Sequence, residues 1–261
     1  ASDAAGGMVR ASARQFSDRT GGEFSSVLSN LRKNLDWISF ECMQQVLVGE
    51  SIDLRDLKRD LLSLYVTLPA MRMDALKGWL RLIVQMQLVA CEEEREQKGN
   101  PCLLILDEFH ALGRLQAVES ALAQMAGFEE RLLIALQHLG QTKVYGSNHE
   151  TFWANSGVVQ VMGCADSYTL DYLSKQLGQT QALARSAHAP TFEQAAKQAM
   201  TGESWSTSSC PLMTPEEIAR YFSRDDKLLR QLVLRPGYRP MILQRGFYDK
   251  HEAFRGRFDE C

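Results

Sequence analysis

The sequence predicts an α/β fold whose mostly parallel sheet is covered by helices on both faces. Three strand-and-helix units follow one another between residues 102 and 176, and the first strand contains the apolar run Leu-Leu-Ile-Leu at residues 103–106. Strands that alternate with helices favour a parallel sheet, because each helix carries the chain back across the sheet. Right-handed crossovers then give a doubly wound arrangement.

The individual elements follow from short apolar runs and from apolar residues at helical spacing. In chain order we expect a helix at residues 24–48, a strand at 62–69, a helix at 74–97, strands at 102–107, 131–137 and 158–162 with helices at 116–125, toward Tyr145 and at 167–176, a helix at 215–222, and closing strands at 228–234 and 241–247. Thr214 is placed to cap the helix that Pro215 begins. Residues 179–209 are polar, and we interpret them as a mobile loop with a short helix at 192–200.

The composition is typical of a globular protein with a sizeable core. The chain has 261 residues, of which 45% are hydrophobic and 23% are charged. Its net charge of −3 and its pI near 6.0 provide no overall positive field for nucleic acid. Any DNA contact must therefore be local, or be created when several subunits assemble into a ring.

Cysteine spacing and apolar run lengths exclude several other classes. The six cysteines are widely spaced, and no two form a C-x-x-C pair, so a metal site is not expected. We interpret them as free thiols in a reducing cytoplasm. A secretory leader is not expected. The longest apolar stretch, residues 80–90, is interrupted by polar residues and is shorter than the roughly 20 apolar residues that a membrane span requires.

Two acids mark the best candidate for a functional site. Asp107 and Glu108 directly follow the apolar strand, and the carboxyl ends of strands are where open α/β sheets bind ligands. In nucleotide-hydrolysing proteins, an acid at this place holds the Mg²⁺ of a bound triphosphate, and a second carboxylate orients the attacking water. The alternative is a core strand whose acids cap the next helix.

A series of short segments resembles one family, the type IV secretion coupling proteins or TraG-like conjugative DNA-transfer ATPases. The segment after the acids, Phe-His-Ala-Leu-Gly-Arg at residues 109–114, is similar to the sequence that follows the acidic strand in that family. The other similar segments occur in the same order as in the family. They lie at residues 25–31, 64–69, 137–146, 151–155, 163–166, 173–178, 205–206, 211–218 and 239–240. The resemblance therefore covers residues 22–254, nearly the whole chain.

The resemblance implies a RecA-like P-loop NTPase core and a division of the chain into three parts. Residues 1–22 would be a flexible lead, residues 23–49 the end of an all-helical, substrate-facing domain, and residues 50–261 the C-terminal part of the nucleotide-binding domain. The phosphate-binding loop G-x-x-x-x-G-K-[ST] is missing, because the sequence contains no Gly-Lys pair. We therefore expect the loop, and the family's membrane helices, upstream of this chain.

The family's functional residues carry over onto a few positions. Asp107 would be the carboxylate on the Mg²⁺ side of ATP, Glu108 the base that orients water, and Gln137 the group that senses the γ-phosphate. Arg131 or Arg114 would be the arginine that reaches a neighbouring subunit's nucleotide, which requires a ring. Each role needs ATP and Mg²⁺ held by residues outside this chain, so the chain alone is expected to be inactive.

The resemblance also implies partners and a location. The intact protein would be a homo-hexamer at the cytoplasmic face of the bacterial inner membrane, held by its N-terminal helices. It would pass single-stranded DNA with its relaxase, or effector proteins, to the components of the secretion channel. Two alternatives remain. The chain is a catalytically silent remnant that binds or regulates partners, or it belongs to another RecA-like motor, which explains residues 109–114 and 205–218 poorly.

Overall fold

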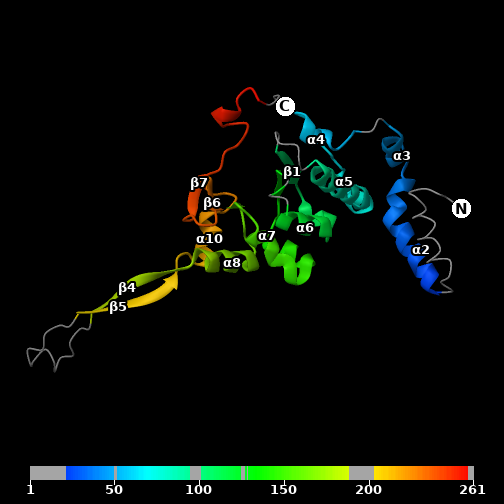
Figure 1. Ribbon diagram of the computed structural model, residues 1–261. Coiled ribbons are helices and arrows are strands. Elements are labelled where there is room, and N and C mark those ends of the chain that lie inside the picture. Colours follow the sequence, from blue (N-terminus) through cyan, green and yellow to red (C-terminus); the bar gives the residue numbers. More distant parts are fainter. Residues whose placement is uncertain are drawn as a thin grey trace, which may run out of the picture. The chain divides into compact units, whose positions relative to one another are not determined.

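The computed structural model describes residues 22–49, 52–94, 101–124, 127, 129–187 and 203–257. The chain divides into two compact units, Ala1–Ala135 and Leu136–Cys261. Figure 1 shows the elements along the chain. The expected lead up to residue 21 and the short helix expected at residues 192–200 lie outside the described residues.

The first unit begins with two helices where the sequence predicts one. The α-helices α2 (Gly22–Leu35) and α3 (Glu41–Val48) are separated by the 3-10 helix η2 (Asp36–Ser39). The break places Trp37, which is only 6% exposed, in a small core with Met43 and Leu76. Trp37 lies so close to Gly78 that a Cβ atom there would be 2.8 Å from its ring, so this contact depends on a glycine.

The long helix of the first unit is close to its predicted position, but the strand predicted before it is absent. Helix α5 spans Met73–Glu93 and follows the short helices α4 (Asp56–Arg59) and η3 (Ala70–Arg72). Residues 62–69 run without a partner strand among the described residues, and Tyr65 is 85% exposed. Branched and aromatic residues favour a strand only where a neighbouring strand supplies hydrogen bonds.

A parallel strand pair confirms the α/β class. Strands β1 (Cys102–Leu106) and β2 (Glu130–Ile134) are parallel and in register from Cys102 beside Glu130 to Leu106 beside Ile134. The 3-10 helix η4 (Phe109–Leu112) and the helix α6 (Gln116–Gln124) connect them. Helix α5 contacts both connecting elements.

The two faces of this strand pair differ in burial. Cys102 and Leu106 are buried on the face that α5 covers. On the opposite face, Leu103, Ile105 and Leu133 are about half exposed, at 54%, 58% and 48%. Within the first unit as described, helices therefore cover one face, whereas the sequence predicts helices on both.

The second unit is built on an antiparallel sheet. Strands β3 (Val159–Val161), β6 (Arg230–Leu234) and β7 (Met241–Gln244) pair in the order β3-β6-β7. Strand–helix alternation predicts a parallel partner for β3, so this pairing differs from the prediction. The described helices of this unit are η6 (Leu139–Glu150), α7 (Thr151–Ala154), α8 (Ser167–Leu177), α10 (Pro215–Tyr221) and η7 (Glu252–Phe254).

The core of the second unit lies where α8 and α10 pack together with β6. Its buried residues are Cys164, Leu170, Leu173, Ile218, Phe222 and Leu232. Both helices begin as the sequence indicates. Thr214 accepts a hydrogen bond from the backbone N–H of Glu217, whose carboxylate accepts one from the N–H of Thr214, a reciprocal cap.

The polar segment predicted to be a mobile loop contains a hairpin. Strands β4 (Gln179–Ala187) and β5 (Glu203–Pro211) are antiparallel and pair along their full length. The loop prediction rests on polar composition. The side chains at residues 179–183 and 206–209 are exposed, so no alternation of apolar and polar residues marks these stretches as strands.

Candidate active site

The acids after β1 lie on an exposed and conformationally unusual turn. The side chains of Asp107 and Glu108 are both exposed, and an Asp107 carboxylate oxygen accepts a hydrogen bond of 3.1 Å from the Glu108 backbone N–H. Glu108 has φ 50° and ψ 40°, in the left-handed region. For a residue with a side chain this conformation costs about 1 kcal/mol or more, and such strain clusters at functional sites.

Buried apolar side chains hold this turn in place. Phe109, Leu112 and Leu115 are 2%, 3% and 3% exposed and belong to the core below the turn. Gly113 has φ 64° and ψ −162°, a conformation that side-chain-bearing residues avoid. The structure therefore explains the sequence Phe-x-x-Leu-Gly that follows the acids. The phenylalanine and the leucine are buried and hold the turn in place, and the glycine allows the chain to bend.

Arg81 on α5 is a further support that the sequence analysis missed. Its Nη1 donates hydrogen bonds to the backbone carbonyls of Leu112, at 2.6 Å, and of Arg114, at 2.8 Å. These bonds tie the far side of the acidic turn to α5. The available signal was an arginine, the single charged residue, within the mostly apolar stretch at residues 80–90.

Two basic side chains follow the acids in the chain. His110 Nδ1 lies 3.3 Å from a carboxylate oxygen of Glu108, an ion pair when the imidazole is protonated. Arg114, one of the two candidate arginines, is 3.6 Å from the carboxylate of Glu119, and 55% of its side chain is exposed. Its guanidinium therefore remains accessible from solvent.

The other candidate arginine lies toward the opposite end of the strand pair. Arg131 is exposed and is paired in register with Leu103, four residues before Asp107. At the strand rise of roughly 3.3 Å per residue, this is about 13 Å along the strand from the acids. Within one subunit, the register thus separates Arg131 from the acidic turn.

Gln137 follows β2 by three residues and belongs to the second unit. Strand β2 ends at the same edge as β1, because the strands are parallel and the Ala135 N–H donates to the carbonyl of Leu106 at 3.1 Å. Gln137 is exposed, and its backbone N–H donates to the side-chain oxygen of Gln141 at 2.9 Å. The carboxyl end of β2 thus lies beside the carboxyl end of β1, which leads into the two acids.

The carboxylate oxygens at the acidic turn suit a hard cation such as Mg²⁺ that also binds oxygen atoms of a second molecule. Mg²⁺ prefers oxygen ligands and commonly takes only one or two carboxylates, with water and phosphate filling the other positions. Asp107 and Glu108 provide such exposed oxygens. In the described part of the chain, no three histidine, cysteine or acidic side chains form a cluster able to hold a metal by themselves.

These features define a class of protein. It is the class of α/β proteins that carry exposed acids on a braced turn at the carboxyl end of a parallel strand, the place where open α/β sheets bind ligands. Within that class, the chain belongs to the family described as type IV secretory system conjugative DNA transfer, which matches residues 7–260. The predicted family is therefore confirmed.

Similar proteins are conjugation and transfer proteins. The protein VirD4 of Agrobacterium fabrum (strain C58) is 29% identical over 210 residues, which cover 79% of this chain and 30% of that protein. The conjugal transfer protein TraG of Rhizobium radiobacter is 25% identical over 248 residues, which cover 94% of this chain and 38% of that protein. The chain thus spans well under half the length of either relative.

The fold matches that of solved coupling proteins. The bacterial conjugative coupling protein TrwBdeltaN70, in its unbound form, aligns with a TM-score of 0.64 at 20% identity, covering 90% of this chain and 53% of that one. TrwB in complex with ADP and Mg²⁺ aligns with a TM-score of 0.64 at 18% identity. Among the described residues, no helix is long and apolar enough to cross a membrane.

Proposed function

We propose that this chain is part of a type IV secretion coupling ATPase, which drives substrates into the secretion channel by hydrolysing ATP. The observation that carries the proposal is the pair of exposed acids, Asp107 and Glu108, at the end of a parallel strand in a member of this family. The strained backbone of Glu108 and the buried anchors below it support a role that requires fixed geometry.

Each candidate residue has one task in this proposal. Asp107 would bind on the Mg²⁺ side of the nucleotide, and Glu108 would orient the attacking water and accept its proton. Gln137 would contact the γ-phosphate from the end of β2. When Mg²⁺ is bound together with ATP, the metal ion neutralises part of the negative charge on the phosphates. TrwB has been solved in complex with the GTP analogue GDPNP and with ADP and Mg²⁺, which supports this cofactor class.

The rest of the nucleotide site would come from outside this chain. No G-x-x-x-x-G-K-[ST] sequence is present, and the chain matches only part of its relatives. We propose that residues 23–49 end a helical domain and that residues 50–261 belong to the nucleotide-binding domain. The full protein would be a hexamer at the cytoplasmic face of the inner membrane, with Arg131 or Arg114 reaching the neighbouring subunit's nucleotide.

The cargo would be DNA with its relaxase, effector proteins, or both. The family's role in conjugative DNA transfer favours DNA. The net charge of −3 is not that of a DNA-coating protein, so the strand would be gripped locally, within an assembled ring.

The test uses the protein that contains this chain together with its phosphate-binding loop. We expect Glu108→Gln to abolish ATP hydrolysis while nucleotide binding persists, and Asp107→Ala to weaken Mg²⁺-dependent binding. Both variants should abolish transfer in a mating assay. Glu92→Gln, which changes an exposed acid on α5, serves as the control. Hydrolysis and transfer that persist in both acidic-turn variants would refute the proposal.

A second candidate function is a silent module that binds or regulates partners. The missing phosphate-binding loop favours it, because residues 1–261 alone offer no lysine-containing cradle for phosphates. Isothermal titration of the chain with Mg²⁺ and ATP separates the candidates. Tight binding by the isolated chain would argue against the silent module. No binding by the chain, together with no ATP hydrolysis by any longer protein that contains it, would support the module.

A further inference from the structure

A buried polar cluster lies at the amino end of β1, away from the acidic turn. It consists of Lys58, Gln87, Cys91, Cys102 and Glu130, from α4, α5, β1 and β2. Their exposed fractions are 3%, 4%, 0%, 8% and 5%. Ionisable groups this deeply buried are uncommon, and the proposed function uses none of them.

Backbone geometry brings the members of this cluster together. Cys102 and Glu130 are partners in the parallel register, so their side chains point to the same face of the strand pair. That face is covered by α5, where Gln87 and Cys91 are four residues apart and therefore neighbours on one side of the helix.

The two sulfur atoms are neighbours. The Nε2 of Gln87 donates to Cys91 Sγ at 3.1 Å and to Cys102 Sγ at 3.6 Å, so a single amide bridges both sulfurs. The two thiols also influence each other, and their interaction shifts the pKa of Cys91 up and the pKa of Cys102 down. Neither cysteine is in a disulfide.

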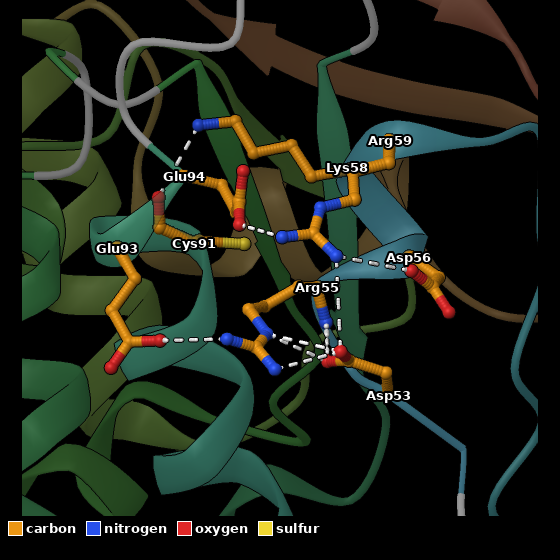
Figure 2. Close-up of polar contacts among 8 residues, drawn as sticks. All are labelled: Asp53, Arg55, Asp56, Lys58, Arg59, Cys91, Glu93 and Glu94. Atoms are coloured by element: carbon orange, nitrogen blue, oxygen red, sulfur yellow. Dashed lines mark hydrogen bonds and ion pairs between the residues drawn. The ribbon is translucent and has the colours of Figure 1, made fainter.

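A buried lysine and a buried acid flank the two thiols. Lys58 Nζ donates to the backbone carbonyl of Cys91 at 3.3 Å, as Figure 2 shows. Both carboxylate oxygens of Glu130 are inaccessible to solvent and lack a hydrogen-bond partner of good geometry. Burial, followed by the nearby Cys102 sulfur, raises the pKa of Glu130 to about 7.

The two thiols are electrostatically unequal. The hydrogen bond from Cys91 lowers the pKa of Cys102 to about 7, with further lowering by Gln87 and the Lys58 charge, while burial opposes the change. The same hydrogen bond, burial and the Glu130 charge raise the pKa of Cys91. Cys102 is thus the thiol of the pair that loses its proton more readily. A reactive thiol beside a second thiol is the arrangement from which a disulfide forms.

We propose that Cys91 and Cys102 form a reversible intramolecular disulfide when the protein meets a hydroperoxide. The Cys102 thiolate attacks one peroxide oxygen and the O–O bond breaks, leaving a sulfenic acid on Cys102 and, after protonation, one water. Cys91 then loses its proton to Glu130, and its sulfur attacks the Cys102 sulfur. The S–O bond breaks and the hydroxyl leaves as a second water. Two thiols and one peroxide thus give one disulfide and two waters.

This bond would couple the redox state to the strand that carries the acids. It would join the last turns of α5 to the first residue of β1, whose other end leads into Asp107. Arg81 on the same helix holds the turn after the acids. Helix α5 would then be linked to this region twice. The disulfide would hold the start of β1, and the Arg81 hydrogen bonds would hold the turn that follows the acids.

The direct test is peptide mapping of the 261-residue chain. The chain is treated with hydrogen peroxide at neutral pH, its remaining thiols are alkylated, and it is digested with trypsin without reduction. Cleavage separates residues 82–95, which contain Cys91, from residues 99–114, which contain Cys102. We expect these peptides to be joined, the intact mass to fall by two hydrogens, and dithiothreitol to reverse both changes.

Cys164 provides an internal control, and two variants test the mechanism. Burial, followed by the neighbouring Asp166, raises the pKa of Cys164 to about 11, so this buried thiol should stay reduced. Lys58→Met should slow disulfide formation several-fold, whereas Lys77→Met, which removes an exposed lysine paired with Asp74, should not. Alkylation of both Cys91 and Cys102, irreversible oxidation of Cys102 alone, or links only between different chains would each overturn the proposal.

Discussion

The two ends of β1 place ionisable groups in opposite surroundings. At its amino end, Cys102 lies beside Glu130 in a buried cluster with little access to water. At its carboxyl end, Asp107 and Glu108 are exposed on a turn held from below by Phe109. One short strand thus separates two solvated carboxylates from a desolvated thiol and its neighbouring carboxyl group.

The difference shows how burial decides what a charged group can do. An exposed carboxylate keeps its charge at no desolvation cost and can bind a cation, which is what the proposed function requires. A buried carboxylate without strong partners gives up its charge instead, and its pKa rises. In the two proposals, a carboxyl group would therefore serve as a cation ligand at the exposed end and as a proton acceptor at the buried end.

The largest expected effect comes from removing the apolar support of the exposed end. Phe109→Ala should lower the free energy of unfolding by about 3–5 kcal/mol, because a large buried ring is replaced by a cavity. Urea unfolding of the chain measures it. Leu103→Ala, at a position that is 54% exposed on the same strand, should cost less than about 1 kcal/mol. Equal costs would show that the turn is not anchored through Phe109.

The next effect is a pH dependence that belongs to the buried end. Glu130 has a pKa of about 7 in the folded chain, against 4.5 when unfolded, so the folded state binds more protons between these values. The free energy of unfolding should therefore fall as pH rises from about 4.5 to about 7, by at most about 3 kcal/mol.

The glutamine of the Glu130→Gln variant cannot ionise, so the free energy of unfolding of this variant should fall less between these pH values. Denaturant midpoints measured across the pH range test this expectation. Glu92→Gln changes an exposed acid and should leave the slope as it is. A slope that survives in Glu130→Gln would mean that the buried cluster does not control the pH response.

A smaller effect is expected at the arginine that braces the acidic turn. Arg81→Met keeps the aliphatic length but removes the hydrogen bonds to the carbonyls of Leu112 and Arg114. It should cost about 1.5–3 kcal/mol, and amide hydrogen exchange in the turn should accelerate. Lys77→Met on the same helix is the control. Unchanged exchange in Arg81→Met would show that the apolar anchors alone fix the turn.

The smallest effect is expected at the exposed ion pairs beside the buried cluster. Arg59 on α4 pairs with Glu94, with Asp56 at 3.5 Å and with Asp53 at 3.8 Å, as Figure 2 shows. Hydrogen bonds from Arg55 lower the pKa of Asp53 to about 2. Because water and salt screen exposed pairs, Arg59→Ala should change Tm little. A Tm loss as large as that of Phe109→Ala would contradict this ranking.

Local features could be predicted well from the sequence. The apolar run followed by two acids correctly indicates β1 and its exposed end. Thr214 with Pro215 correctly indicates the start of α10, because a helix cap depends on residues that are adjacent in the chain. The family resemblance rests on similarly local segments and is confirmed.

Features that depend on distant partners could not be predicted in this way. The antiparallel pairing of β3 with β6, the β4–β5 hairpin and the break in the helix at Trp37 each require a partner far away in sequence. The same is true of Arg81, which looks like an interruption of an apolar helix until its two carbonyl acceptors are known.

The sequence by itself determined the class of the protein, its family and the positions of the two acids, because these depend on neighbouring residues and short motifs. Only the tertiary structure decided which groups lose contact with water. Cys91, Cys102, Lys58 and Glu130 look like scattered thiols and charges in the sequence, and they form one cluster because a helix packs over a parallel strand pair. Burial depends on how elements pack together, and no local pattern records that packing.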